Sequence, residues 1–177
     1  MVCAPLSNPC LSAYCSPQLG CTSKSIANGT NVATLAPKSV KGLTSVVAVG
    51  AYGSSFCAVR ADGGVSCWGL NKYGQLGDGT TTDRSTPVQV TAVTGADGVS
   101  IDQDRACAHT KSNAVVCWGK YGVSTVTSSS TSVSWGTWHG CVTATGGGVA
   151  CWGDNYDGQL GDGTKTNNGK PVAVQGL

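Results

Sequence analysis

The sequence predicts an all-β protein, a partial β-propeller of about three four-stranded blades of which one is shortened. Three observations predict it: the composition of the 177-residue chain, a hairpin pattern that occurs three times, and a glycine-rich loop that occurs twice. The chain holds 26 glycines, and only 11% of its residues are charged. This composition favours short strands and tight turns over helices, which draw on charged and unbranched residues.

A cysteine-bounded hairpin occurs at residues 57–67, 107–117 and 141–151. Each copy reads Cys-x9-Cys-Trp-Gly, with β-branched residues beside the cysteines and turn-forming residues in the middle. Valine, threonine and tryptophan favour strands, whereas glycine, asparagine and aspartate favour turns. Each copy therefore predicts two antiparallel strands joined by a short turn.

A second motif, Asn-x-x-Gly-Gln-Leu-Gly-Asp-Gly-Thr, follows two of the hairpins, at residues 71–80 and 155–164. A proline then opens an extended stretch, at Pro87 and again at Pro171. One repeat is therefore interpreted as a proline-led strand, a valine-rich strand, the hairpin and the loop. Four strands per unit are typical of a propeller blade. The repeats are expected to occupy residues 31–177, and a further, incomplete repeat is expected to begin at residue 171.

The spacing of the cysteines predicts three cross-strand disulfides. With Val59 opposite Val65, Cys57 lies directly across from Cys67 on the same face of the hairpin. Directly opposed residues have Cα atoms about 4.5–5.5 Å apart, and disulfides span about 4.4–6.8 Å. The two cysteines have the same spacing in the other hairpins, so the expected pairs are Cys57–Cys67, Cys107–Cys117 and Cys141–Cys151. The alternative is six buried free thiols in a reduced protein.

Residues 1–30 form a separate cysteine-rich segment with Cys3, Cys10, Cys15 and Cys21 in a stretch rich in proline and serine. The segment resembles a short cysteine-rich module of bacterial surface proteins, which implies disulfides. Four cysteines allow three connectivities, and the sequence does not choose among them. A zinc site is disfavoured because the segment has no Cys-x2-Cys pair and no histidine. A disordered, partly oxidised tail is the remaining alternative.

The motif Cys-Trp-Gly-x-Asn-x-x-Gly-Gln-Leu-Gly-Asp-Gly-Thr, at residues 67–80 and 151–164, resembles the repeat of the regulator of chromosome condensation family in its bacterial, cysteine-bearing form. The resemblance covers roughly residues 37–177 and implies a propeller, usually of seven blades. The family includes a nuclear exchange factor for a small GTPase and a secreted bacterial inhibitor of β-lactamases. A propeller fold does not by itself determine an activity.

Ten cysteines favour an oxidising compartment, so an extracellular or cell-surface location is expected although the chain carries no recognisable signal peptide. The net charge of +2 is too small to predict nucleic-acid binding, and no apolar run approaches the ~20 residues of a membrane helix. Neither His109 nor His139 has a nucleophile context. The sequence therefore predicts no enzyme, no cofactor and no metal.

The leading functional hypothesis is a non-catalytic protein-binding scaffold of a secreted or surface bacterial protein, with an unknown protein as its partner. Tyr73, Trp138 and Tyr156 are the expected aromatic anchors, because interfaces favour tryptophan and tyrosine; they could equally only cover loops. The alternatives are an exchange-factor-like regulator of a small GTPase, a purely structural repeat segment and, least supported, an enzyme. Three blades are too few for the usual ring, which predicts self-association, further blades from a longer chain, or an unstable fragment.

Overall fold

The computed structural model describes residues 15–16, 20–21, 39–127 and 129–176. The chain divides into two units, residues 1–39 and 40–177. In the first unit, β1 (Cys15–Ser16) pairs antiparallel with β2 (Gly20–Cys21), and Cys15 lies opposite Cys21. Cys3 and Cys10 lie outside the described residues, so the disulfide framework of the cysteine-rich segment stays a prediction.

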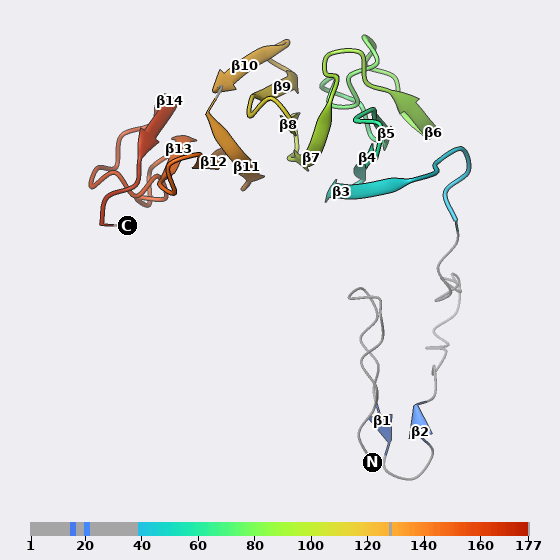
Figure 1. The fold of residues 1–177 in the computed structure, drawn as a ribbon, viewed down its shortest axis with the longest axis horizontal. Helices are drawn as coiled ribbons and strands as arrows, with labels where there is room; N and C mark the ends of the chain where they lie inside the picture. Colours follow the sequence, from blue (N-terminus) through green and yellow to red (C-terminus); the bar gives the residue numbers. More distant parts are fainter. Residues whose placement is uncertain (1–14, 17–19, 22–38, 128, 177) are drawn as a thin grey trace. The chain divides into compact units, whose positions relative to one another are not determined.

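The second unit consists of three four-stranded antiparallel sheets that follow one another along the chain (Figure 1). We call them blades 1, 2 and 3. Blade 1 holds β3 (Val46–Tyr52), β4 (Ser55–Arg60), β5 (Val65–Gly69) and β6 (Arg84–Gln89). Blade 2 holds β7 (Ala96–Ile101), β8 (Arg105–Thr110), β9 (Val115–Gly119) and β10 (Ser124–Thr127). Blade 3 holds β11 (Ser130–Trp135), β12 (His139–Ala144), β13 (Val149–Gly153) and β14 (Asn168–Ala173). The all-β prediction is confirmed, since the described residues contain no helix.

The proline-led strands differ from the sequence-based interpretation in their place within the repeat. Pro87 lies in β6, which pairs with β5 of the preceding hairpin, and Pro171 lies in β14, which pairs with β13. Each proline-led strand therefore completes a blade as its outer strand and does not open the next one. The strand at residue 171 belongs to blade 3 and is not the start of a further blade. An outer strand suits proline because proline cannot donate a ladder hydrogen bond.

Blade 2 has all four strands although its repeat is short. The serine- and threonine-rich stretch that follows the second hairpin forms β10, which pairs with β9 through Ser124 opposite Cys117. The connection between β9 and β10 is only the four residues 120–123, where blades 1 and 3 have the long glycine-rich loop. The shortening therefore falls on a loop and leaves the sheet intact.

The three predicted disulfides are present in the structure. Cys57 pairs with Cys67, Cys107 with Cys117, and Cys141 with Cys151. The paired Cα atoms are 4.0, 4.0 and 4.1 Å apart, closer than the expected separation. Each pair sits directly opposite in the register of its hairpin, as the spacing predicts.

The core lies between consecutive blades. One face of blade 1 packs on blade 2 through a cluster that includes Val59, Val65, Leu76, Ile101 and Trp118. One face of blade 2 packs on blade 3 through a second cluster, with Cys107, Val115, Cys117, Val142 and Trp152. A blade therefore has two different faces: the forward face, which packs on the next blade, and the backward face, which packs on the one before. This arrangement stabilises each sheet by its neighbours, as in other repeat folds.

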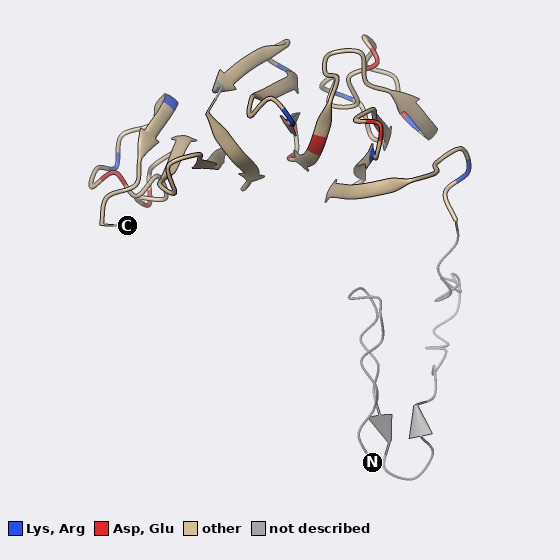
Figure 2. Cartoon of the chain, viewed as in Figure 1, with Lys and Arg blue, Asp and Glu red and all other residues tan. Residues whose placement is uncertain are grey.

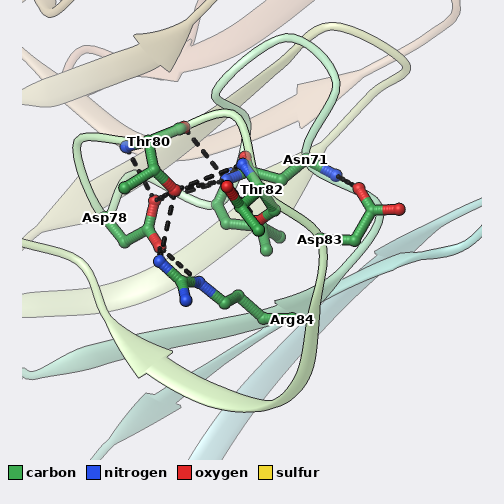
Figure 3. A network of polar contacts seen from close by, with 7 residues as sticks. Asn71, Asp78, Thr80, Thr82, Asp83 and Arg84 are labelled. Carbon is green, nitrogen blue, oxygen red and sulfur yellow. Dashed lines mark hydrogen bonds and ion pairs between the residues drawn. The ribbon is translucent and has the colours of Figure 1, made fainter.

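A buried asparagine organises each long glycine-rich loop (Figure 3). Asn71 is fully buried, and its Nδ2 donates to the carbonyl oxygens of Thr80 and Thr82 at 3.0 and 3.1 Å. Its Oδ1 accepts from the Leu76 amide at 3.0 Å. Asn155 makes the same contacts with Thr164, Thr166 and Leu160. These bonds explain the asparagine four residues after the second cysteine: it closes a loop whose carbonyls have no strand partner.

Aspartate side chains support the same loops from outside. Asp78 accepts from the amide and hydroxyl of Thr80 at 2.9 and 2.8 Å, and Arg84 Nε donates to it at 2.7 Å. Burial alone would raise the pKa of Asp78. The hydrogen bonds from Thr80 and Arg84 outweigh the effect of burial, so the pKa lies below its ordinary value. The structure thus gives Asp78 a role in the turn. Asp162 has the same two bonds to Thr164.

Candidate protein-binding surface at the loop end of the blades

Loops of two kinds meet at one end of each blade. Because antiparallel strands alternate in direction, the turn between the first and second strands lies at the same end as the loop between the third and fourth. We call this the loop end; it comprises turns 53–54, 102–104 and 136–138 and loops 70–83, 120–123 and 154–167. Charged residues gather in the loops, while most of the strand surface carries none (Figure 2).

All three aromatic residues expected as anchors belong to the loop end. Tyr156 is 69% exposed and Trp138 is 42% exposed, whereas Tyr73 is half-buried. The turn of Trp138 and the loop of Tyr156 are adjacent, because the Asp154 amide donates to the Trp138 carbonyl at 3.0 Å. Tyr73 contacts a different set of residues, from blades 1 and 2. The structure therefore places the three residues at one end but does not join them in one cluster.

The structure adds a cluster that the sequence did not reveal, and its members are alternately cationic and aromatic. We call it the cationic–aromatic cluster: Lys72, Tyr73, Lys120, Tyr121, Arg105 and Trp135. Lys120 Nζ lies 5.5 Å from the Tyr73 ring centre and 5.2 Å from that of Tyr121. Arg105 lies 4.9 Å from the Tyr121 ring centre and 4.6 Å from that of Trp135. The cluster thus runs from blade 1 through blade 2 to blade 3.

Two buried carboxylates hold Lys120 and Arg105 of this cluster in place. Asp104 is 1% exposed and accepts from Lys120 Nζ and Arg105 Nε, both at 3.3 Å. Interaction with Tyr121, then with Asp104, raises the pKa of Lys120. Lys120 and Tyr121 themselves remain exposed. Fixed cations that alternate with aromatic rings favour carboxylate-bearing and aromatic ligands.

Asp102 is the second buried carboxylate and is incompletely satisfied. Its Oδ1 accepts from the amides of Asp104 and Arg105 at 2.8 and 2.9 Å. Its Oδ2 is buried with no hydrogen-bond partner among the described residues, although Arg105 Nε lies 3.6 Å away. Burial raises the pKa of Asp102 to about 6. The two amide hydrogen bonds and the Arg105 charge act in the opposite direction but are outweighed.

We expect Asp102→Asn to stabilise the protein at neutral pH. Because the pKa of Asp102 is about 6 when folded and 3.8 ordinarily, folding favours its protonated form. The stabilisation that the protonated Asp102 side chain provides is fully present below pH 3.8. It is lost as the pH rises to about 6, which lowers the free energy of unfolding by about 2–3 kcal/mol. The amide keeps the acceptor for both backbone bonds but loses the Arg105 ion pair, so the expected gain at pH 7.5 is about 1–2 kcal/mol.

Denaturant unfolding at a series of pH values measures this effect. The wild-type protein should lose stability relative to Asp102→Asn between pH 4 and 6, and the exposed Asp157→Asn should follow the wild type. The same pH dependence in wild type and Asp102→Asn would show that Asp102 ionises normally.

His109 makes a contact through each of its ring nitrogens. Both ring nitrogens of His109 face acceptors, with Asp97 Oδ1 at 2.5 Å from Nδ1 and the Ser130 carbonyl at 2.8 Å from Nε2. His109 is 5% exposed and ties β8 to the start of β11. No group of three or more His, Cys, Asp or Glu side chains within the described residues could hold a metal ion. The described part of the chain also contains no helix long and apolar enough to cross a membrane.

Two sequence models of the regulator of chromosome condensation (RCC1) repeat match the chain, one over residues 62–110 and 146–177 and the other over residues 46–75. The chain belongs to the RCC1 repeat family. The family resemblance predicted from the cysteine, tryptophan and glycine spacing is thereby confirmed. The matched stretches contain the glycine-rich loops and their buried asparagines.

Relatives of this RCC1 repeat chain are much longer proteins. Human E3 ubiquitin-protein ligase HERC2 is 31% identical over 86% of this chain but only 4% of its own length. The ultraviolet-B receptor UVR8 of Arabidopsis thaliana is 30% identical over 70% of this chain and 33% of its own length. The chain thus spans a small part of the relatives that it matches.

Solved propellers confirm the fold of the RCC1 repeats. Human WBSCR16 matches 74% of this chain and 40% of its own with a TM-score of 0.67 at 22% identity. Prp20p of Saccharomyces cerevisiae, described with binding properties to Gsp1p and histones, matches 77% of this chain and 40% of its own, with a TM-score of 0.65 at 15% identity. At these identities the likeness shows the fold alone.

Proposed function

We propose that this chain is a non-catalytic protein-binding scaffold whose loop end is the binding surface. The observation that carries the proposal is the cationic–aromatic cluster, which joins all three blades and presents exposed Lys120 and Tyr121. Tyrosine, tryptophan and arginine are enriched in interfaces. The ligand chemistry that suits the cluster is an acidic protein segment with aromatic residues.

We further propose that the scaffold works in an oxidising compartment, outside the cell or on its surface, in a bacterial protein. The three disulfides support the compartment, because cytosolic proteins rarely keep such bonds. The bacterial source rests on the cysteine-bearing form of the repeat. A thiol count on protein purified from its natural compartment tests the location: six alkylatable thiols from residues 57–151 without reduction would overturn it.

Selection of peptides from a displayed random library tests the binding surface. The wild-type chain is expected to enrich acidic peptides, and Lys120→Ala/Tyr121→Ala should lose that enrichment. Lys165→Ala, an exposed lysine of the blade 3 loop outside the cluster, is the matched control and should retain it. Equal enrichment by wild type and the double variant would overturn the assignment of the cluster.

An exchange-factor-like regulator of a small GTPase is the second candidate, and membership of the RCC1 repeat family favours it. It predicts that the chain accelerates release of labelled guanine nucleotide from a small GTPase. The scaffold proposal predicts no acceleration, and the two are therefore separable in one assay.

A further inference from the structure

The outer strands of the three blades can be aligned, because in each of them one residue lies directly opposite the second cysteine of the hairpin. These residues are Val88 in β6, Ser124 in β10 and Val172 in β14. In blades 1 and 3 the residue just before is a proline, Pro87 or Pro171, whereas in blade 2 it is Val123. The outer strand of blade 2 therefore differs from the other two at one aligned position.

The proline of blade 1 stands at a position whose backbone faces away from the sheet. The Val90 amide faces inward, since it donates to the Val65 carbonyl of β5 at 2.9 Å. Backbone groups point alternately to the two sides of a strand, so Pro87, three residues earlier, faces outward. A proline there removes a donor that a further strand would need. By the same alignment, the N–H groups of Val123 and Thr125 face outward in blade 2 and are retained.

The outward side of β10 is not paired within the described part of the chain. β10 is the outer strand of blade 2, and no described strand other than β9 pairs with it. Val123 is 63% exposed, and Ser124 and Thr125 are exposed as well. These residues are uncharged, so they also lack the charged side chains that discourage edge pairing. A register shift between Thr125 and Thr127 interrupts the regular strand, and we therefore call residues 123–125 the open edge.

The open edge continues directly from the cationic–aromatic cluster. Lys120 and Tyr121 precede it in the β9–β10 connection, and only Gly122 separates Tyr121 from Val123. Tyr121 is 67% exposed, and Lys120 Nζ lies 5.2 Å from its ring centre. A strand that pairs with the open edge therefore passes beside these two side chains.

The charges of the cluster favour an acidic strand at this place. Lys72 and Lys120 are exposed, whereas the carboxylates beneath them, Asp102 and Asp104, are each 1% exposed. Lys120 Nζ donates to Asp104 at 3.3 Å, which holds the ammonium group at the surface. The exposed charge of the cluster is thus positive, and charge complementarity favours an acidic segment over a basic one.

We propose that an acidic segment of another protein binds in an extended conformation along residues 123–125 and adds a fifth strand to blade 2. The inference rests on the proposed function and assigns a conformation to the ligand of the loop end. The backbone of the segment accepts from the N–H groups of Val123 and Thr125, and main-chain hydrogen bonds of this kind give affinity when a strand is added to a sheet edge. An acidic side chain of the segment pairs with Lys120. Because the open edge is short, the backbone and the side-chain contacts contribute together.

Two substitutions of one residue test the backbone contact. Val123→Pro introduces into blade 2 the residue that stands at the aligned position of blades 1 and 3, so the variant should fold, as far-ultraviolet circular dichroism can show. The probe is a labelled synthetic copy of an acidic peptide that the wild-type chain enriches. Its affinity, measured by fluorescence anisotropy, should fall about tenfold with Val123→Pro, which removes an outward donor. Val123→Ala keeps the N–H group and is the matched control, which should bind like the wild type.

Methylation of the peptide backbone tests the same contact without a change in the protein. Copies of the peptide are made with one N-methylated amide each. In an added strand, alternate amides of the peptide face β10. Affinity should therefore fall at every second position of the paired stretch and be retained at the positions between. A peptide held by its side chains alone would show no such two-residue period, and that result would overturn the added strand.

The outcomes distinguish this inference from the proposed function. Loss of binding with Lys120→Ala/Tyr121→Ala but not with Val123→Pro would leave the binding surface standing and overturn the added strand. Equal losses with Val123→Pro and Val123→Ala would assign the contact to the valine side chain and overturn the added strand too. A library from which the wild-type chain enriches no acidic peptide would overturn both proposals.

Discussion

Reduction of the three disulfides is expected to unfold the blades at ambient temperature. Each bond closes a loop between residues separated by 10 positions, which contributes about 2.5–3 kcal/mol on the chain-entropy model. Together the three approach roughly 8 kcal/mol, comparable with the 5–15 kcal/mol that typically stabilises a whole domain. The composition adds to this dependence, because a chain with 26 glycines loses much backbone entropy on folding.

Chemical denaturation with and without a thiol reductant measures the loss. The midpoint should fall steeply on reduction, and single-pair variants should divide the effect. Cys107→Ala/Cys117→Ala removes the pair in the middle blade, which has a neighbour on both sides, so it should cost more than Cys141→Ala/Cys151→Ala. An unchanged midpoint after complete reduction would contradict a stabilising role for the disulfides.

The hairpins could be predicted from the sequence because their determinants are local. Residues 57–67 contain both strands, the turn and the two cysteines, so the register follows from counting along one segment. Strand alternation then fixes which side chains share a face. The same reasoning predicted the disulfides, and the structure confirms all three.

The place of the proline-led strand could not be predicted in the same way. Pro87 stands between two valine-rich strands, and the sequence order allows it to pair with either neighbour. The structure pairs β6 with β5 across the long loop, so the blade boundary falls after Val90 and not before Pro87. The choice depends on the loop that Asn71 closes, which returns the chain alongside β5.

The cationic–aromatic cluster was also beyond the sequence-based analysis. Tyr73 was expected as an anchor, but Lys120 and Tyr121 stand where the middle repeat departs from the motif, and no spacing rule marked them. Arg105 joins them only because packing brings turn 102–104 beside loop 120–123. The sequence carries one signal of the cluster, which is the absence of the glycine-rich loop motif after the second hairpin. The residues that replace this motif form the centre of the cationic–aromatic cluster.

Asn71→Ala is expected to destabilise the protein by about 3–4 kcal/mol. The change removes the partners of the Leu76 amide and of the Thr80 and Thr82 carbonyls inside a loop where Asn71 is fully buried. Each buried group left without a partner costs about 1–3 kcal/mol. Leu76 packs in the same cluster as Trp118, so the damage reaches the interface between blades 1 and 2.

Comparison with Asn155→Ala distinguishes the stability lost within the loop from the stability lost at the interface between blades. Asn155 makes the same hydrogen bonds to Leu160, Thr164 and Thr166, but Leu160, although fully buried, belongs to neither of the two clusters between blades. Thermal unfolding should therefore show a larger loss for Asn71→Ala than for Asn155→Ala, with little change for the exposed Thr81→Ala in the blade 1 loop. Equal losses would mean that the asparagine stabilises only its own loop.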